Sequence, residues 1–322
     1  MGDRYGLRWQ DGRDRWAALR EPPGERMSVE KALGSVAVTS SQPAARVRGL
    51  RKSYGDVVAL QNLDLDIASG SVVGLIGRNG AGKTTATRCI AGLLRPDAGE
   101  VQIAASATPG TSPISIATQE IELYPGLNVA TNLTFFGRIS GVPDPERMLT
   151  EVAAELEIEP LLTKLPKEMS IGQQRQVHVA AALMATPRLL LLDEPTAALD
   201  VAARAAVLAA VERRRTAGVG VLFSSHQLRD IEAVCDSVVL IHEGEVIAAG
   251  RVEDLITEYG GARIEVTVDG KVQVIDGEDI PAAIAQVTAG GGRVEAVNVI
   301  KPSLEAVFLT LTGMRGSDVE GI

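Results

Sequence analysis

A glycine-rich segment between a strand pattern and a helix pattern constrains the fold more than any other part of the chain. It reads Gly77-Arg78-Asn79-Gly80-Ala81-Gly82-Lys83-Thr84-Thr85. The preceding run Val72–Ile76 is apolar, as in a buried strand, and residues 86–91 are typical of a helix. In such a loop the glycines let backbone N–H groups surround a polyphosphate, and the helix N-terminus attracts anions. The segment therefore predicts a site for a nucleoside triphosphate.

The residue types in this loop predict how it holds the triphosphate. Lys83 can reach the β- and γ-phosphates, and the Thr84 hydroxyl can ligate Mg²⁺. The alternative is a glycine-rich turn that matches the pattern by chance, which the flanking strand and helix disfavour. The residues expected to contact the nucleotide are Gly77, Asn79, Gly80, Ala81, Gly82, Lys83, Thr84 and Thr85.

Composition narrows the class of protein. The chain has 322 residues, enough for two domains or for one large domain with an appendage. With 45% hydrophobic and 23% charged residues it can fill a core, which argues against global disorder. The net charge of −9 argues against nucleic acid as a partner, because phosphate binding requires a basic surface.

The cysteine content and the hydropathy of the chain indicate in which cellular compartment the protein is expected. Cys89 and Cys235 are the only cysteines, without a Cys-x-x-Cys pair, which fits a reducing cytosol and excludes a cysteine-based zinc site. Both are expected to be small buried apolar residues. No apolar run approaches the length of about 18 residues that a membrane span needs, and the N-terminus lacks an apolar signal core. A role at a membrane would therefore require a partner.

A second motif places acidic residues at the end of an apolar run. Residues 189–192 are all leucine, and Asp193 and Glu194 follow them. A buried strand would deliver Asp193 to the phosphate side of the sheet, where it can hold Mg²⁺ through water. Glu194 would lie beside the γ-phosphate and orient or deprotonate the attacking water. The alternative is a core strand that ends in solvated acids.

Residues 46–259 alternate short strands with helices. Residues 63–67 alternate with period two, as in a half-buried antiparallel strand, whereas residues 219–223 form a continuous apolar run, as in a parallel strand covered on both faces. The pattern predicts an α/β core with an antiparallel flank. Helices are expected near residues 127–140, 145–158, 172–185, 201–216, 227–234 and 251–259.

The two ends of the chain differ from this core. Residues 1–45 have mixed charges and Pro/Ser-rich breaks, and are expected to be a disordered extension. An alternative is a docking arm, to which Trp9 and Trp16 would belong. Another alternative is that translation starts later, at Met27. Residues 260–313 are expected to form a small α+β appendage, with a hairpin turn at Asp269-Gly270 and a closing helix after Ser303, and residues 314–322 a tail.

The segment Met169-Ser170-Ile171-Gly172-Gln173-Gln174-Arg175 resembles the Leu-Ser-Gly-Gly-Gln signature of ATP-binding-cassette ATPases. In that family the signature begins a helix and contacts the γ-phosphate of ATP held by the opposing subunit. The resemblance implies this role for Ser170, Gly172 and Gln173. Ile171 departs from the family's first glycine, and a β-branched residue resists positive φ and adds bulk at a closing surface. Because Ser170, Gly172 and Gln173 remain, we expect a working site with an altered dimer affinity or turnover.

Other positions match the family in chain order. The resemblance implies that Tyr54 stacks on adenine, although a lone tyrosine is more often packing or surface. It implies that Gln119 senses Mg²⁺ and links the site to a membrane partner, although residues 114–118 are a poor strand pattern. It further implies that Asp200 contacts the other subunit, and that His226 bonds the γ-phosphate.

The resemblance implies a P-loop NTPase core, with a mostly parallel sheet, an antiparallel β flank and a helical subdomain. It also implies an ATPase that uses ATP and Mg²⁺ and couples dimer closure to a separate transmembrane permease. The chain would act as a homodimer in the cytoplasm, on the inner face of the cell membrane. Residues 302–313 resemble the tail of subunits from bacterial drug-, antibiotic- and polysaccharide-type exporters. The alternative is a soluble, nucleotide-dependent regulator of the same superfamily.

Overall fold

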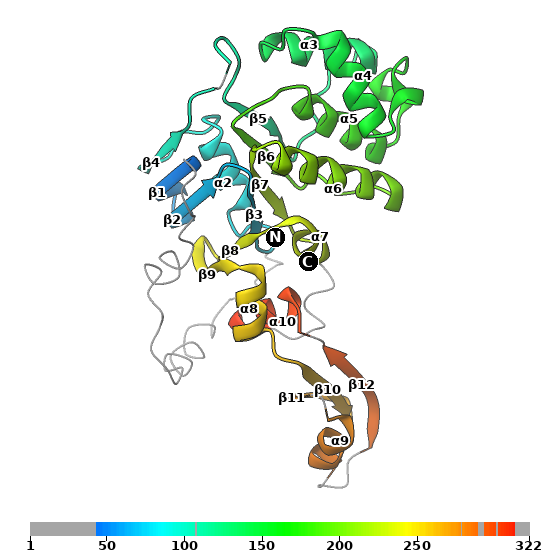
Figure 1. Ribbon diagram of the computed structural model, residues 1–322. Coiled ribbons are helices and arrows are strands. Elements are labelled where there is room, and N and C mark those ends of the chain that lie inside the picture. The colour runs from blue at the N-terminus through cyan, green and yellow to red at the C-terminus, as the bar shows by residue number, and fades with distance from the viewer. Residues whose placement is uncertain (1–42, 107, 278, 289–292, 301, 313–322) are drawn as a thin grey trace, which may run out of the picture.

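The computed structural model describes residues 43–106, 108–277, 279–288, 293–300 and 302–312 (Figure 1). The expectations for residues 1–42 and for the tail 314–322 lie outside these residues. No described helix is long and apolar enough to cross a membrane. Cys89 and Cys235 are buried free thiols, as predicted.

A six-stranded sheet forms the centre of the molecule. Its strand order is β5-β6-β7-β3-β8-β9, in which β9 is antiparallel to β8 and the other neighbours are parallel. The weak pattern before Gln119 is therefore a true strand, because β5 gains its hydrogen bonds from β6. The strands are β3 Val72–Ile76, β5 Ile114–Ala117, β6 Leu189–Asp193, β7 Gly220–Ser225, β8 Ser237–His242 and β9 Glu245–Arg251.

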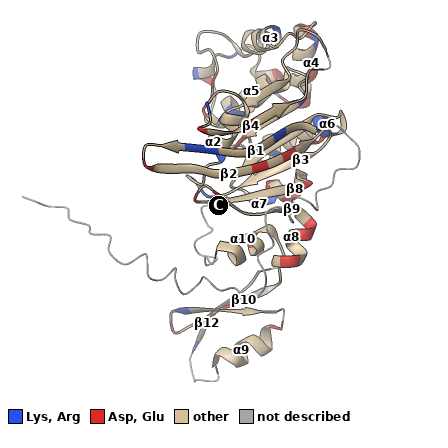
Figure 2. Ribbon diagram, turned by 90° about the vertical axis from the view of Figure 1, so that its left-hand side faces the viewer, with Lys and Arg blue, Asp and Glu red and all other residues tan. Residues whose placement is uncertain are grey.

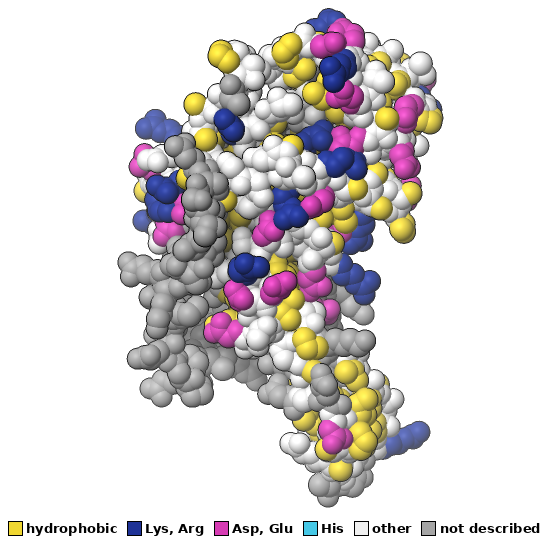
Figure 3. Space-filling view, viewed as in Figure 1, with side chains coloured by type: hydrophobic (Ala, Val, Ile, Leu, Met, Phe, Trp, Pro, Cys, Tyr) yellow, Lys and Arg dark blue, Asp and Glu magenta, His cyan; other side chains and the backbone are white. Residues whose placement is uncertain are grey.

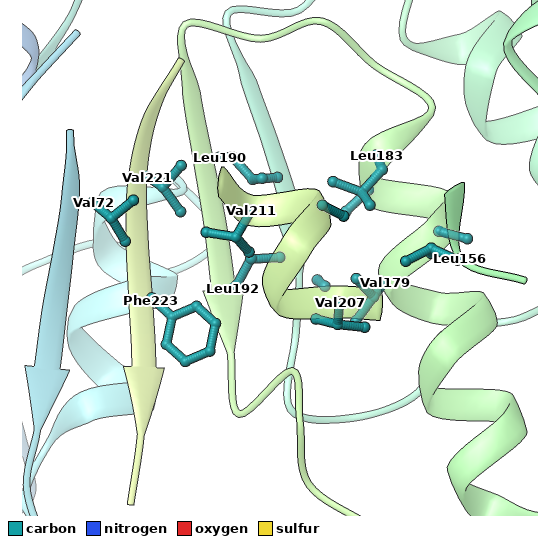
Figure 4. Close-up of a cluster of buried hydrophobic side chains, with 14 of the residues drawn as sticks. Val72, Leu156, Val179, Leu183, Leu190, Leu192, Val207, Val211, Val221 and Phe223 are labelled. Carbon is teal, nitrogen blue, oxygen red and sulfur yellow. The ribbon is translucent and has the colours of Figure 1, made fainter. Parts of the chain in front are cut away.

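Alternate residues of these strands enter two separate cores, because successive side chains of a strand point to opposite faces. Leu190, Leu192 and Phe223 lie in one core, whereas Leu189 and Leu191 lie in the other. Figure 4 shows the first of these cores. Val207 and Val211 of α6 (Val201–Thr216) and Val179 and Leu183 of α5 (Ile171–Leu183) pack there beside the side chains of β3, β6 and β7. Burial on both faces explains the continuous apolar runs of these strands.

An antiparallel sheet forms the predicted flank. It has the order β2-β1-β4, with β1 Pro43–Tyr54, β2 Val57–Ala68 and β4 Ala98–Ile103. β1 begins three residues before the predicted boundary at 46. The flank and α2 (Lys83–Ile90) share the second core with the central sheet. Basic residues of β1 lie beside acidic residues of β2 (Figure 2), and Arg48 pairs with Asp66 at 2.7 Å.

The helical part begins after β5. It contains α3 Val129–Ile139, α4 Pro145–Glu155 and α5 Ile171–Leu183, with 3₁₀ turns at Glu159–Leu161 and Pro166–Glu168. Asn128 and Asp144 cap α3 and α4 with their side chains. Glu155 of α4 pairs with Arg214 of α6 (Val201–Thr216) at 2.9 Å and connects the helical part to the central core.

A small α+β unit follows α7 (Leu228–Val234) and α8 (Val252–Tyr259) and extends away from the main body (Figure 1). Its sheet has the order β11-β10-β12, and Ile264, Val266 and Ala283 form its own small core. Apolar side chains gather on this unit in Figure 3, and Val274, Val297 and Val299 are among the exposed ones. The elements are β10 Arg263–Val268, β11 Lys271–Asp276, α9 Ile280–Thr288 and β12 Val294–Ile300.

The closing helix α10 (Leu304–Thr312) differs from the predicted arrangement. Residues 260–313 are predicted as one appendage, but Leu304, Val307 and Phe308 lie in the core of the central sheet. The N–H of Leu304 donates to Glu232 Oε1 of α7 at 2.6 Å. The chain thus leaves the core after α8, forms the small unit, and returns. The apolar face of α10 was visible in the sequence, but its packing partner was not.

Candidate active site

The phosphate loop connects β3 to α2, as predicted. Gly82 has φ 112° and is the N-cap of α2, and a Cβ there would clash with the carbonyl of Ala59. Glycine is therefore required both for the backbone angle and for the close approach of β2. Lys83 is the first residue of the helix and is 6% exposed, and its Nζ donates to the carbonyl of Gly77 at 2.6 Å.

A pocket of about 190 Å³ lies over this loop. Within the phosphate loop, Gly77 and Ala81 are predicted to contact the nucleotide but do not line the pocket, because Gly77 packs against the carbonyl of Ile241 and Ala81 is buried. Ala59 of β2 lines the pocket without having been predicted. The lining residues are Ala59, Arg78, Asn79, Gly80, Gly82, Lys83, Thr84, Thr85, Gln119 and Glu194.

The three predicted catalytic side chains lie close together; Lys83 and Glu194 line the pocket, whereas His226 does not line it but contacts Glu194. Glu194 follows β6 and His226 follows β7, and these two strands are neighbours in the sheet. Glu194 Oε2 lies 2.6 Å from His226 Nδ1, and Glu194 Oε1 lies 3.4 Å from Lys83 Nζ. The carboxylate is 6% exposed, and its Oε1 has no hydrogen-bond partner within the part of the chain that the structure describes. A buried acceptor without a partner is suited to hold a water molecule or a substrate group.

The backbone at Glu194 is strained. Its φ of 52° lies in the left-handed region, which costs a non-glycine residue about 1–2 kcal/mol. The Glu194 N–H donates to the carbonyl of Ser224 at 3.1 Å, and the Ser224 hydroxyl donates to Asp193 Oδ1. β7 therefore holds both acidic residues at the end of β6.

The oxygen donors expected for Mg²⁺ are also near the pocket. The Thr84 hydroxyl donates to Gln119 Oε1 at 3.0 Å, which puts two neutral oxygens side by side. Asp193 is 1% exposed at the end of β6. A hydroxyl, an amide oxygen and a carboxylate are ligands that suit Mg²⁺, which binds few protein oxygens and completes its shell with water and phosphate. The residues present fit the ion.

The signature segment forms the start of α5. Ser170 is the N-cap, its Oγ accepts the N–H of Gln173 at 3.2 Å, and Gln173 Oε1 accepts the N–H of Ser170 at 3.2 Å. This reciprocal capping box is a Ser-x-x-Gln pattern that the sequence could have revealed. A Cβ on Gly172 would lie 2.5 Å from the carbonyl of Ala198. Gly172 is therefore needed for contact with the loop after β6 of the same chain.

Ile171 does not have the backbone strain expected for it. It is the first residue of α5 and is not among the described non-glycine residues with positive φ. Its side chain is 63% exposed. Resistance to positive φ therefore plays no part here, because the segment is an ordinary helix start. An altered dimer affinity or turnover stays a prediction. The Ile171 side chain does add apolar bulk to the surface, as expected.

Other predicted residues lie outside the pocket lining. Tyr54 ends β1 and is 52% exposed, and Lys52 Nζ lies 5.9 Å from its ring centroid. Asp200 caps α6, where its Oδ1 accepts the N–H of Ala203 at 2.8 Å. Ser170, Gly172 and Gln173 do not line the pocket either. A contact of these residues with nucleotide stays a prediction.

Arg175 was not identified from the sequence. It lies on α5, is 8% exposed, and donates from Nη1 to the carbonyl of Thr118 at 2.9 Å and from Nη2 to the carbonyl of Gln119. The signature helix thus holds the backbone beside the Thr84–Gln119 pair. Nothing in the local pattern marks this arginine, because its partners are main-chain atoms of residues far away in the sequence.

His178 is a histidine outside the pocket lining; it lies on α5 and is 4% exposed. Burial, and secondly the charge of Arg175, lower the pKa of His178 to about 4 from its usual 6.5. The His178 imidazole is therefore protonated below about pH 6.5 in the unfolded chain, but only below about pH 4 in the folded chain. This contribution to stability is complete above pH 6.5 and is lost as the pH falls towards 4.

We expect the free energy of unfolding to fall by about 3 kcal/mol on account of this histidine when the pH is lowered from about 7.5 to about 4. In His178→Leu this part of the pH dependence is absent. Urea unfolding of both proteins at the two pH values measures the difference. Equal pH dependence in wild type and His178→Leu contradicts the prediction.

The glycine-rich loop follows β3, and the buried pair Asp193 and Glu194 lies at the end of β6 in the same sheet. This arrangement defines a P-loop protein that binds a nucleoside triphosphate. A profile of the ABC transporter family matches residues 60–197. The linearmycin resistance ATP-binding protein of Bacillus subtilis is 32% identical over 306 residues, covering 83% of this chain and 98% of that protein. The chain belongs to the ABC transporter family, as an ATP-binding subunit.

Two further similarities extend this result. Nod factor export ATP-binding protein I of Cupriavidus metallidurans is 32% identical over 301 residues, covering 85% of this chain and 98% of that protein. The dimeric post-hydrolysis structure of an ATP-binding cassette bound to ADP and phosphate has a TM-score of 0.58 at 25% identity, covering 64% of this chain and 98% of that chain. The predicted fold class and family are confirmed.

Proposed function

We propose that this protein hydrolyses ATP between two copies of itself and drives a separate membrane permease that exports a compound. The contacts of the buried Glu194 carboxylate with Lys83 and with His226, at the edge of one pocket, carry the proposal. A buried carboxylate that contacts a histidine beside a phosphate loop has the parts that a hydrolytic site needs.

In this proposal Glu194 accepts a proton from the water that attacks the γ-phosphate. Lys83 offers its charge to the β- and γ-phosphates, and His226, held through Nδ1 by Glu194, orients the γ-phosphate. Thr84, Gln119 and Asp193 would hold Mg²⁺. The ion supplies positive charge to the phosphate oxygens when it is bound.

A second copy completes the site in this proposal. The pocket of about 190 Å³ is smaller than the 300–1,000 Å³ usual for small-molecule sites, which favours a site that a second copy completes. Ser170 and Asp200 are exposed helix caps outside the pocket lining. The N-terminus of α5 could face the γ-phosphate of the opposite copy. The dimeric relative with ADP and phosphate supports this arrangement.

An aromatic cluster near Gln119 is the proposed contact for the permease. Tyr124, 48% exposed, lies with its ring centroid 5.0 Å from that of Phe135 and 6.0 Å from that of Phe136. The buried side chain of Asn132 binds both the N–H and the carbonyl of Tyr124 and fixes this loop on α3. Aromatic side chains are enriched in protein interfaces. A permease bound here would keep the protein at the inner face of the membrane.

The direction of transport is proposed from the relatives. The named relatives act in linearmycin resistance and in Nod factor export, and this chain spans 98% of each of them. One name states export and the other states resistance to a compound, which removal of that compound from the cell would provide, so we propose export.

The proposed function is tested on the protein together with the membrane protein that co-purifies with it. The pair is reconstituted in vesicles and the MgATP-dependent movement of compounds is measured, with Lys83→Ala as the control that lacks the phosphate-binding cation. We expect transport out of the nucleotide-binding side and phosphate release that depend on Lys83. ATP binding with little turnover, whether or not the membrane protein is present, would instead identify a nucleotide-dependent regulator.

A further inference from the structure

The loop that leaves the end of β6 contains two strained residues. Glu194 has φ 52° and Ala198 has φ 63°, and both are non-glycine residues in the left-handed region. Such angles persist only where the surroundings enforce them. The loop carries Glu194 at its start and Asp200 at its end, so its shape determines where two proposed functional residues lie.

A buried carboxylate on α7 holds this loop near both ends. Asp230 is 0% exposed. Its Oδ2 accepts the hydroxyl of Thr196 at 2.6 Å, and its Oδ1 accepts Nε of Arg204 at 2.5 Å. Thr196 lies two residues after Glu194, and Arg204 lies in the first turn of α6, just beyond Asp200. The two oxygens of the Asp230 carboxylate therefore bind residues near the two ends of the loop.

The same helix begins directly after the histidine that contacts Glu194. α7 starts at Leu228, and the N–H of Asp230 donates to the carbonyl of Gln227. Two residue pairs thus join the segment Glu194–Thr196 to the segment His226–Asp230. Glu194 Oε2 contacts both Nδ1 and the N–H of His226, and the Thr196 hydroxyl donates to Asp230. The second pair is deeper in the protein, since Thr196 is 2% exposed whereas the His226 side chain is 30% exposed.

We propose that Asp230 is a positioning residue for the reaction: by holding Thr196 and Arg204 it keeps loop 194–200 in the strained form that presents Glu194 to His226. The inference rests on the proposed function only for the role of Glu194 in turnover. Without this clamp the loop can relax towards unstrained angles, and the carboxylate moves away from the imidazole. Asp230 touches neither nucleotide nor water in this scheme.

Thr196→Val removes the hydroxyl with almost no change in shape and leaves Asp230 its bond to Arg204. We expect turnover to fall on the order of 10- to 10²-fold, because a displacement of about 1 Å has such effects. The KM for MgATP should change little, since the phosphate loop is untouched. Thr196→Ser restores the hydroxyl and should recover most of the turnover. Thr310→Val, which removes a hydrogen-bonded hydroxyl on α10, is the matched control.

Two further measurements separate positioning from general destabilisation. In the Glu194→Gln background Thr196→Val should cause no further loss, because residues that act through one another are not additive. The Nδ1 NMR signal of His226 should shift in Glu194→Gln, and we expect it to shift in Thr196→Val as well. Only three histidines are present, so a His226→Gln sample assigns it. Should Thr196→Val fail to fold, Arg204→Gln tests the other carboxylate oxygen, from a side chain that is 32% exposed.

Any of three results would overturn the inference. These are wild-type turnover in Thr196→Val, an equal loss of turnover from Thr196→Val in the wild type and in Glu194→Gln, and an unchanged His226 signal in Thr196→Val. Normal turnover of Glu194→Gln would instead refute the proposed catalytic role, and the His226 signal would then decide the clamp alone.

Discussion

Replacing Glu194 with glutamine is expected to lower ATP turnover on the order of 10²- to 10⁴-fold while MgATP still binds. The amide has the shape of the carboxylate but cannot take a proton from water. The carboxylate is buried, lies 2.6 Å from His226 Nδ1 and 3.4 Å from Lys83 Nζ, and has one oxygen without a hydrogen-bond partner in the described part of the chain. Steady-state phosphate release measures turnover, and nucleotide titration measures binding.

Glu243→Gln is a matched control for this substitution. Glu243 also has a left-handed backbone, with φ 49°, but it is exposed in the turn between β8 and β9. The same loss of charge at the same kind of backbone angle should leave turnover unchanged. Near-normal turnover of purified Glu194→Gln would refute the proposed base. If this variant also stays monomeric in excess MgATP, alone and with its permease, the proposed dimer is refuted as well.

Phe308→Ala is expected to reduce the free energy of unfolding of the nucleotide-binding core by about 3–5 kcal/mol. Phe308 is among the largest fully buried side chains, and it packs in the same cluster as Leu192 and Phe223 of the central sheet. Removing the ring leaves a cavity in that core, although residue 308 follows the small α+β unit in the sequence. Urea unfolding monitored by nucleotide binding reports on the core itself.

The comparison variant is Val299→Ala on β12, whose side chain is 40% exposed. A surface substitution of this kind changes stability by about 0.5 kcal/mol or less. Should Phe308→Ala leave the unfolding of the nucleotide-binding core unchanged, α10 would belong to the small unit energetically, despite its contacts.

Local sequence patterns predicted the central part of the fold well. Val72–Ile76, the glycine loop and α2 form one contiguous strand–loop–helix, and each of these structures depends mainly on its own residues. The helix over residues 201–216 was predicted at its observed bounds, because Asp200 caps it and its composition favours helix. Continuous leucines likewise indicated a strand covered on both faces, and β6 is such a strand.

Contacts between distant segments escaped the sequence patterns. β12 and the strands β1, β4, β8 and β9 were not predicted one by one, since their residues are stabilised by partners elsewhere in the chain. Gly172 resembled a glycine for a ligand, but within one chain its small size serves contact with Ala198. Tyr54 matched a family position, yet Ala59 of the same hairpin lines the pocket.

The sequence by itself determined the class of site, because a phosphate loop and its helix are built from adjacent residues whose chemistry is explicit. Only the tertiary structure decided that Glu194 meets His226, that Asp230 and Arg175 hold the surrounding backbone, and that α10 returns to the core. Those relations arise where strands neighbouring in space are far apart in the chain, and the burial that enforces them exists only after the sheet has formed.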